Sequence, residues 1–119
     1  MVQSGKIILV IDDDKDFQTI LKVTLNQSGY KVRSLFDGEI THTINEKPFP
    51  DVILLDVDFP YANGVEVGKK LKSNPSTKDI PVIMVSANPY ADELSKEVGA
   101  ADYVQKPFTL KTLIQKVQA

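Results

Sequence analysis

The chain has 119 residues, 42% of them hydrophobic and 25% charged, which is typical of one globular domain. Its formal net charge of -2 offers no basic field for nucleic acid or an anionic membrane, and the absence of cysteine excludes disulfides and Cys-ligated zinc. No apolar run approaches the roughly 20 residues of a membrane span, and residues 1–6 lack the apolar core of a signal peptide, so we expect one cytoplasmic domain over residues 1–119.

Five segments have the pattern of β-strands. Residues 7–11, 52–55 and 82–85 are unbroken apolar runs, which are typical of strands buried on both faces of a sheet. Residues 31–36 and 102–105 are mixed in polarity and fit edge strands, where polar side chains discourage unwanted pairing. The first, third and fourth strands are therefore expected at the centre, which predicts the strand order 2-1-3-4-5.

Segments of helical periodicity alternate with these strands. The clearest apolar stripes cover residues 17–25, 64–71, 91–98 and 110–117. The face of the first stripe consists of Phe17, Ile20, Leu21, Thr24 and Leu25. Gly29 is expected to end this helix and Thr109 to cap the last one, while residues 38–46 form the weakest helical segment. The alternation predicts an α/β fold: a doubly wound, flavodoxin-like parallel sheet of five strands with five helices on both faces.

Acidic residues follow the first and third strands directly. Asp12, Asp13 and Asp14 come after the first strand, with Asp16 close behind, and Asp56 follows the third strand. Because these strands are predicted neighbours at the point where the winding of the sheet reverses, Asp12, Asp13 and Asp56 should meet there. Asp14 or Asp16 can cap a helix, but the other carboxylates repel one another unless a cation such as Mg²⁺ relieves them. The same acidic loop argues against a flavin or nucleotide site, which needs a Gly-rich or hydroxyl-rich phosphate cradle.

Two further polar groups follow the fourth and fifth strands. Ser86 comes after the fourth strand, and Lys106 comes after the fifth, so both are expected at the same sheet edge as Asp56. A carboxylate, a metal ion, a cation and a hydroxyl donor together describe a site for a phosphoryl group. We also expect the Lys106–Pro107 peptide bond to be cis, a form whose cost is low only before proline.

Four motifs carry a resemblance to a known family. In chain order they read I-L-V-I-D-D-D, D-V-I-L-L-D-V-D-F-P-Y-A-N-G, P-V-I-M-V-S-A and G-A-A-D-Y-V-Q-K-P-F. Over nearly its whole length the chain resembles the response-regulator receiver domain of two-component and phosphorelay signalling. The resemblance implies that Asp56 accepts a phosphoryl group from a phosphohistidine of a histidine kinase or histidine phosphotransfer protein.

The same resemblance implies roles for the surrounding residues. Asp13, Asp56 and the backbone carbonyl of Asp58 would bind Mg²⁺ directly, and Asp12 would act through water. Lys106 would neutralise the phosphoryl group, Ser86 would donate a hydrogen bond to it, and Tyr103 would be an aromatic switch. Such a domain catalyses only its own phosphorylation and dephosphorylation, and it signals to a downstream protein through the surface of the fourth helix, fifth strand and last helix.

Three features depart from the family pattern. Asp58 stands where an amide or hydrophobic residue is common, and Phe59 stands where methionine is usual. The stretch 86–106 is one or two residues shorter than is typical, so the fourth helix is expected to be short or shifted. No output domain follows Ala119, which leaves a single-domain regulator and an excised receiver both open.

Two alternative functions remain at this point. The sequence Asp56-Val57-Asp58 also resembles the D-x-D nucleophile motif of haloacid-dehalogenase-like phosphatases, in which the second aspartate is a general acid. That motif normally follows the first strand of a much longer chain. The other alternative is a receiver-like module that binds partners without being phosphorylated.

Overall fold

The computed structural model describes residues 6–36, 48–58 and 64–118. Its strands are β1 (Ile7–Ile11), β2 (Lys31–Leu35), β3 (Val52–Asp56), β4 (Val82–Ser86) and β5 (Asp102–Gln105). Its helices are α1 (Lys15–Gln27), α3 (Gly64–Ser73), α4 (Ala91–Val98) and α5 (Leu110–Gln118). The helix expected over residues 38–46 lies outside the described residues, as does Phe59. In the described part of the chain, no helix has both the length and the apolar character needed to cross a membrane.

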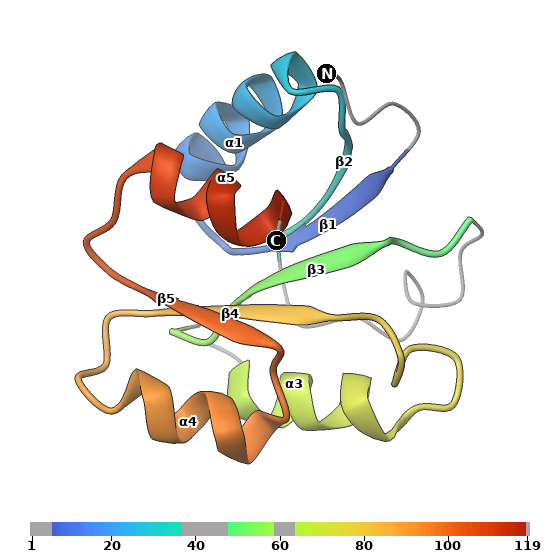
Figure 1. The fold of residues 1–119 in the computed structure, drawn as a ribbon, viewed down its shortest axis with the longest axis vertical. Coiled ribbons are helices and arrows are strands. Elements are labelled where there is room, and N and C mark those ends of the chain that lie inside the picture. The colour runs from blue at the N-terminus through green and yellow to red at the C-terminus, as the bar shows by residue number, and fades with distance from the viewer. Residues whose placement is uncertain (1–5, 37–47, 59–63, 119) are drawn as a thin grey trace.

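The five strands form one parallel sheet in the order β2-β1-β3-β4-β5, as predicted (Figure 1). All residues of β1 and β4 are buried, whereas both edge strands, β2 and β5, contain exposed residues. Ile11 pairs with Leu55 in the ladder between β1 and β3, and Asp56 pairs with Val85 in the next ladder. This register places Asp12, the residue after Ile11, beside Asp56 at the carboxyl edge of the sheet.

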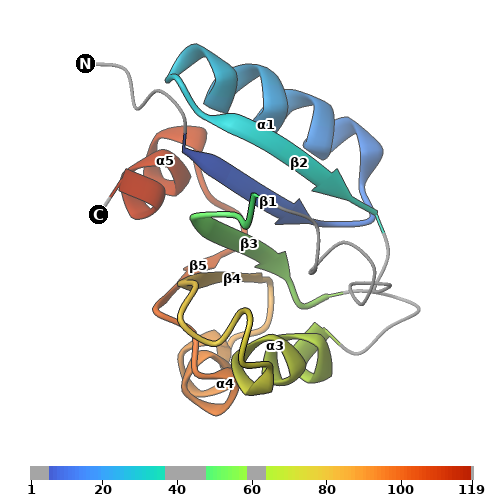
Figure 2. The ribbon, with the colours of Figure 1, turned by 90° about the vertical axis from the view of Figure 1, so that its right-hand side faces the viewer.

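Helices cover both faces of the sheet (Figure 2). Helices α1 and α5 lie on one face, and α3 and α4 lie on the other. The core on the α1/α5 side includes Ile8, Val10, Leu21, Leu25, Leu54, Ile83, Val85 and Leu113. The core on the α3/α4 side includes Leu9, Ile11, Ile53, Leu55, Val67, Leu71, Met84 and Val98. Successive residues of each central strand thus enter opposite cores, which explains why these strands are apolar without alternation.

Local capping features mark the starts of α1 and α5 and the end of α4. The Asp14 carboxylate accepts a hydrogen bond from the backbone N–H of Phe17 at 3.0 Å and caps α1. Thr109 caps α5 as predicted, because its hydroxyl accepts the backbone N–H of Thr112 at 3.1 Å. Helix α4 ends at Gly99, which has a φ of 83°, a left-handed conformation that glycine adopts at little cost.

The buried face of α1 differs from the predicted one. Its buried residues are Gln18, Leu21 and Leu25, whereas Ile20 is 50% exposed. The spacing of the buried residues, i, i+3 and i+7, places a polar side chain, Gln18, at the N-terminal end of the packed stripe. Ile20, expected on the apolar face, is exposed and lines a pocket, whereas Gln18, which hydrogen-bonds to the sheet, is buried.

Helix α4 is short, in agreement with the shortened stretch between Ser86 and Lys106. It has eight residues, and the loop before it contains Asn88, whose side-chain oxygen accepts the backbone N–H of Tyr90 at 2.8 Å. The Tyr90 side chain is 66% exposed. The loop between β4 and α4 is therefore a compact turn. It directly follows Ser86, the last residue of β4, at the carboxyl edge of the sheet.

Candidate functional site

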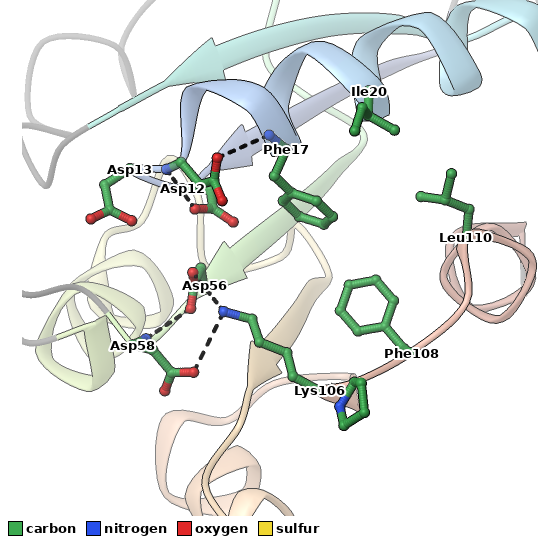
Figure 3. A pocket seen from close by; sticks show the side chains of 11 residues that line it. Asp12, Asp13, Phe17, Ile20, Asp56, Asp58, Lys106, Phe108 and Leu110 are labelled. Carbon is green, nitrogen blue, oxygen red and sulfur yellow. Dashed lines mark hydrogen bonds and ion pairs between the residues drawn. The ribbon is translucent and has the colours of Figure 1, made fainter.

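Three carboxylates meet at the carboxyl edge of the sheet, as the sequence predicted (Figure 3). Oxygen atoms of Asp12, Asp13 and Asp56 all lie within 4.8 Å of one another. Asp12 is 3% exposed and Asp56 is 5% exposed, whereas Asp13 is exposed to solvent. The Asp12 carboxylate also accepts a hydrogen bond from the backbone N–H of Asp14 at 2.9 Å. This contact connects Asp12 to the residue that caps α1.

The burial of Asp12 alters its ionisation. Desolvation is the largest cause, and together with the negative charge of Asp56 it raises the pKa of Asp12 from 3.8 to about 7. The hydrogen bond from the Asp14 N–H and the charge of Lys106 act in the opposite direction but are weaker. A buried carboxyl group with a raised pKa beside two other carboxylates is an environment that a divalent cation would stabilise.

Lys106 provides the positive charge of the site. Its Nζ atom lies 3.0 Å from Oδ2 of Asp56 and 3.5 Å from Oδ2 of Asp58 (Figure 3). Burial disfavours the ammonium form, but the carboxylates of Asp56, Asp58 and Asp12 outweigh it and raise the pKa of Lys106. The Lys106–Pro107 peptide bond is cis, as predicted. The structure therefore brings together the lysine and the aspartate that the sequence placed 50 residues apart.

Asp58 and Ser86 are connected by their side chains. The fully buried Ser86 hydroxyl donates to Oδ1 of Asp58 at 3.0 Å, and the backbone N–H of Ala87 donates to Oδ2 of the same carboxylate at 2.7 Å. The Asp58 backbone N–H donates to Oδ1 of Asp56 at 2.8 Å. The sequence predicted only extra negative charge at Asp58; its partners come from the far end of β4, which a local pattern does not reveal.

A pocket of about 580 Å³ opens beside these groups. The carboxylates and Lys106 form its polar end, and the side chains of Phe17, Ile20, Phe108 and Leu110 extend it between α1 and α5. Phe17 and Phe108 meet edge to face with their ring centres 5.8 Å apart, which joins the loop after β5 to α1. A side chain of a partner that reached Asp56 would therefore contact an apolar wall.

Gln18 is a residue of the site that the sequence analysis missed. It is buried, and its side-chain N–H₂ group lies 2.9 Å from the carbonyl oxygen of Val10 and 3.1 Å from those of Asp12 and Leu35. These contacts connect α1 to the ends of β1 and β2, next to Asp12. The sequence does contain a signal for this role, because Gln18 lies at helical spacing, i, i+3 and i+7, with the apolar Leu21 and Leu25.

Tyr103 lies on β5, one strand away from Ser86. It is partly buried and packs against the cluster formed by Met84, Ala91 and Val98, beneath α4. In the ladder it pairs with Met84, two residues before Ser86. The predicted switch residue therefore contacts the helix that follows the Ser86 loop.

The donor set fits a magnesium ion. Asp12, Asp13 and Asp56 provide hard oxygen ligands in one cluster, and the described residues around them include no sulfur or imidazole. Burial first, and then the charge of Asp56, raise the pKa of Asp12, and a bound cation would favour its ionised form.

The fold and the site together define a class of protein. A parallel sheet of order 2-1-3-4-5 with carboxylates at its switch point and a lysine after the last strand is the architecture of a receiver-type signalling domain. Residues 8–118 match the model of the response regulator receiver domain family. The chain belongs to the response regulator receiver domain family, and so to two-component signalling. This membership leaves the phosphatase alternative without support, because that alternative rested on Asp56-Val57-Asp58 alone.

Individual relatives agree with this assignment. The chain is 35% identical over 117 residues to the phosphate regulon transcriptional regulatory protein PhoB of Pseudomonas aeruginosa; the alignment covers 97% of the chain and 51% of PhoB. The chain thus spans about half the length of this relative. Its structure is similar to the chemotaxis protein CheY4 of Vibrio cholerae (TM-score 0.85, 30% identity, 95% of this chain and 96% of CheY4). It is also similar to the Mn²⁺-bound form of the response regulator Rcp1 (TM-score 0.76, 30% identity, 96% of this chain and 90% of Rcp1).

Proposed function

We propose that this domain is a cytoplasmic phosphoryl acceptor, modified on Asp56 by a histidine kinase or a histidine phosphotransfer protein. The observation that carries the proposal is the contact between Lys106 Nζ and Oδ2 of Asp56 at 3.0 Å, beside the carboxylates of Asp12 and Asp13. A nearly buried carboxylate with an adjacent cation and an adjacent metal-binding cluster is equipped to take up a phosphoryl group.

In the proposed reaction, an oxygen of the Asp56 carboxylate attacks the phosphorus of a phosphohistidine. The new O–P bond forms as the P–N bond breaks, and the electron pair of that bond remains on the imidazole ring of the donor. The Lys106 ammonium, which contacts the Asp56 carboxylate in the unphosphorylated protein, then pairs with the oxygens of the phosphoryl group. Attack of water on the phosphorus of the acyl phosphate releases inorganic phosphate and restores Asp56, so the domain acts only on itself.

Asp13, Asp56 and the backbone carbonyl of Asp58 are the proposed direct ligands of Mg²⁺, and Asp12 acts through water. Bound Mg²⁺ supplies positive charge that offsets the charge developing on the transferred phosphoryl group. The Mn²⁺-bound form of the relative Rcp1 supports a divalent cation in this fold. In this chain, the buried Asp12 and the exposed Asp13 lie in one cluster of carboxylate oxygens with Asp56, which would hold such an ion.

The output step is proposed to use Ser86 and Tyr103. A phosphoryl group on Asp56 would attract the Ser86 hydroxyl, and Tyr103 packs beneath the helix that follows the Ser86 loop. The resulting change would be read by a downstream protein at the surface formed by α4, β5 and α5.

The decisive experiment is incubation with a small-molecule phosphodonor and Mg²⁺, followed by mass measurement of the intact protein. We expect one phosphoryl adduct that requires Mg²⁺ and is absent in Asp56→Asn. Asp79→Asn, a change to an exposed aspartate before β4, is the matched control and should retain the adduct. An adduct that persists in Asp56→Asn would assign another acceptor, and the absence of any adduct in the wild-type protein would favour a module that only binds partners.

A further inference from the structure

The side chain of Asp58 has a set of partners that the proposed reaction does not explain. Its carboxylate accepts the Ser86 hydroxyl at 3.0 Å and the Ala87 backbone N–H at 2.7 Å, and it lies 3.5 Å from the Lys106 ammonium. One hydroxyl, one loop N–H and one ammonium therefore converge on a single anionic group. The Asp58 side chain is only 33% exposed, although it sits in a loop.

These donors are the groups that a phosphoryl anion on Asp56 would need. Ser86 and Lys106 are its proposed partners, and the Ala87 N–H follows Ser86 in the same turn. The Asp58 backbone N–H is bound to Oδ1 of Asp56 at 2.8 Å, which keeps the Asp58 side chain next to the acceptor. Two anions that need the same donors repel each other and compete for them.

We propose that the Asp58 carboxylate is an internal occupant of the phosphoryl-binding position, which a phosphoryl group on Asp56 must displace from Ser86, Ala87 and Lys106. This inference rests on the proposed function of Asp56. In the unphosphorylated protein, Asp58 satisfies the donors of the β4–α4 turn. Phosphorylation exchanges this internal carboxylate for a more highly charged group attached to Asp56.

The turn after β4 is organised around this contact. The Ser86 hydroxyl donates a hydrogen bond to the Asp58 carboxylate and accepts one from the backbone N–H of Asn88 at 3.0 Å. These two hydrogen bonds fix the orientation of the hydroxyl. When Asp58 is displaced, Ser86 loses the partner that holds it at Asp58 and turns its hydroxyl toward the phosphoryl group. Asp58 thus controls both the affinity of the site for a phosphoryl group and the position of the β4–α4 turn before phosphorylation.

A purely structural role for Asp58 predicts the opposite effect of its removal. If the carboxylate only braced the turn, a variant without it would leave Ser86 and Ala87 less ordered and would bind a phosphoryl group more weakly. If the carboxylate competes with the phosphoryl group, the same variant would bind it more tightly. The sign of the change in affinity therefore separates the two roles.

The experiment measures the affinity for beryllofluoride, a phosphoryl mimic, at saturating Mg²⁺ by NMR titration of the Ala87 amide. Wild-type protein is compared with Asp58→Ala, which removes the carboxylate, and with Asp58→Asn, which removes its charge but keeps an acceptor oxygen. Neither change alters the Asp58 backbone carbonyl. Asp79→Ala, at the opposite end of β4, is the matched control.

We expect Asp58→Ala to bind beryllofluoride about tenfold more tightly than the wild-type protein, the scale of one charge-assisted hydrogen bond. Asp58→Asn should lie between the two, and Asp79→Ala should match the wild type. In the free proteins, the Ala87 amide resonance should move upfield in Asp58→Ala, because its hydrogen bond to a carboxylate is lost.

Equal or weaker binding by Asp58→Ala would overturn the proposed competition while leaving Asp56 as the acceptor. An Ala87 resonance that is unchanged between the two free proteins would also overturn it, since the contact would then be absent in solution. Failure of both the wild-type protein and Asp58→Ala to bind beryllofluoride would overturn the proposed function itself, and the competition with it.

Discussion

At the scale of single residues, the site is defined by charges that are close together and only partly compensated. Asp12 is buried beside Asp56 and Asp13, and Lys106 is paired with Asp56 rather than with Asp12. Desolvation and the charge of Asp56 raise the pKa of Asp12 to about 7, so the ionised form of this group destabilises the metal-free fold. The carboxylates that the proposed reaction uses are therefore expected to reduce stability.

We predict that Asp12→Asn stabilises the metal-free protein at neutral and alkaline pH. The Asp12 carboxyl ionises with a pKa of 3.8 in the unfolded chain and about 7 in the folded one, so folding takes up a proton between these values. The stability of the wild-type protein should thus fall as pH rises through this window, whereas that of the variant should not. At pH 8 the free energy of unfolding of Asp12→Asn should exceed that of the wild-type protein by up to roughly 4 kcal/mol, at about 1.36 kcal/mol per pKa unit. Asparagine retains an oxygen for the Asp14 N–H.

Urea unfolding in EDTA and in excess Mg²⁺ measures this effect. With Mg²⁺ the gain should shrink or change sign, because a bound cation stabilises the wild-type site. Asp13→Asn is the matched control: its side chain is exposed, so its gain in EDTA should be smaller. A wild-type protein that is as stable as Asp12→Asn at pH 8 in EDTA would contradict the prediction.

At the scale of elements, α3 depends on close approaches to its neighbours. A Cβ atom on Gly64, the first residue of α3, would overlap the backbone of Val57, the residue that directly follows β3. A Cβ atom on Gly68, one turn later, would meet only the side chains of Val98 and Leu55. The start of α3 is therefore fixed against the loop that carries Asp58, and a backbone contact cannot yield as a side chain can.

We predict that Gly64→Ala lowers the free energy of unfolding by roughly 1–3 kcal/mol, the usual cost of overpacking. Gly68→Ala should cost less, because rotation of Val98 relieves the contact and alanine favours a helix by about 1 kcal/mol over glycine. Thermal and urea unfolding of the two variants at one pH provide the comparison. If Gly64→Ala proved as stable as the wild-type protein, the close approach of α3 to Val57 would not exist in solution.

At the scale of the whole molecule, the site and the expected output surface are joined through β4, β5 and α4. Ser86 ends β4 at the site, and Tyr103 on the neighbouring strand packs beneath α4 against Met84, Ala91 and Val98. A movement of the turn that contains Ser86 would act on the start of α4, where Ala91 is buried in this cluster. The proposed signal from Asp56 would therefore have a contiguous path of packed residues to the expected output surface of α4, β5 and α5.

We predict that saturation with beryllofluoride and Mg²⁺ changes the ring resonances of Tyr103 and the backbone resonances of Ser86 together. Tyr30, a buried tyrosine on the opposite side of the sheet near the start of β2, is the internal control and should not respond. The Ser86→Ala variant should bind the mimic but lose most of the Tyr103 response. Resonances of Ser86 and Tyr103 that both stay unchanged at saturation would rule out this switch and leave phosphorylation of Asp56 intact.

The sequence by itself determined the strands, their order and the meeting of Asp12, Asp13, Asp56, Ser86 and Lys106, because apolar runs and parallel pairing depend on local pattern and chain direction. Only the tertiary structure decided where two polar side chains point. Gln18 faces the sheet because carbonyl groups of β1, of β2 and of Asp12 accept from its side chain, and the Asp58 carboxylate faces Ser86, Ala87 and Lys106. Most of those partners come from segments distant in the chain. Hydrogen bonding across the fold, and not residue spacing, therefore sets the inward face of α1 and places the Asp58 carboxylate at the proposed phosphoryl position.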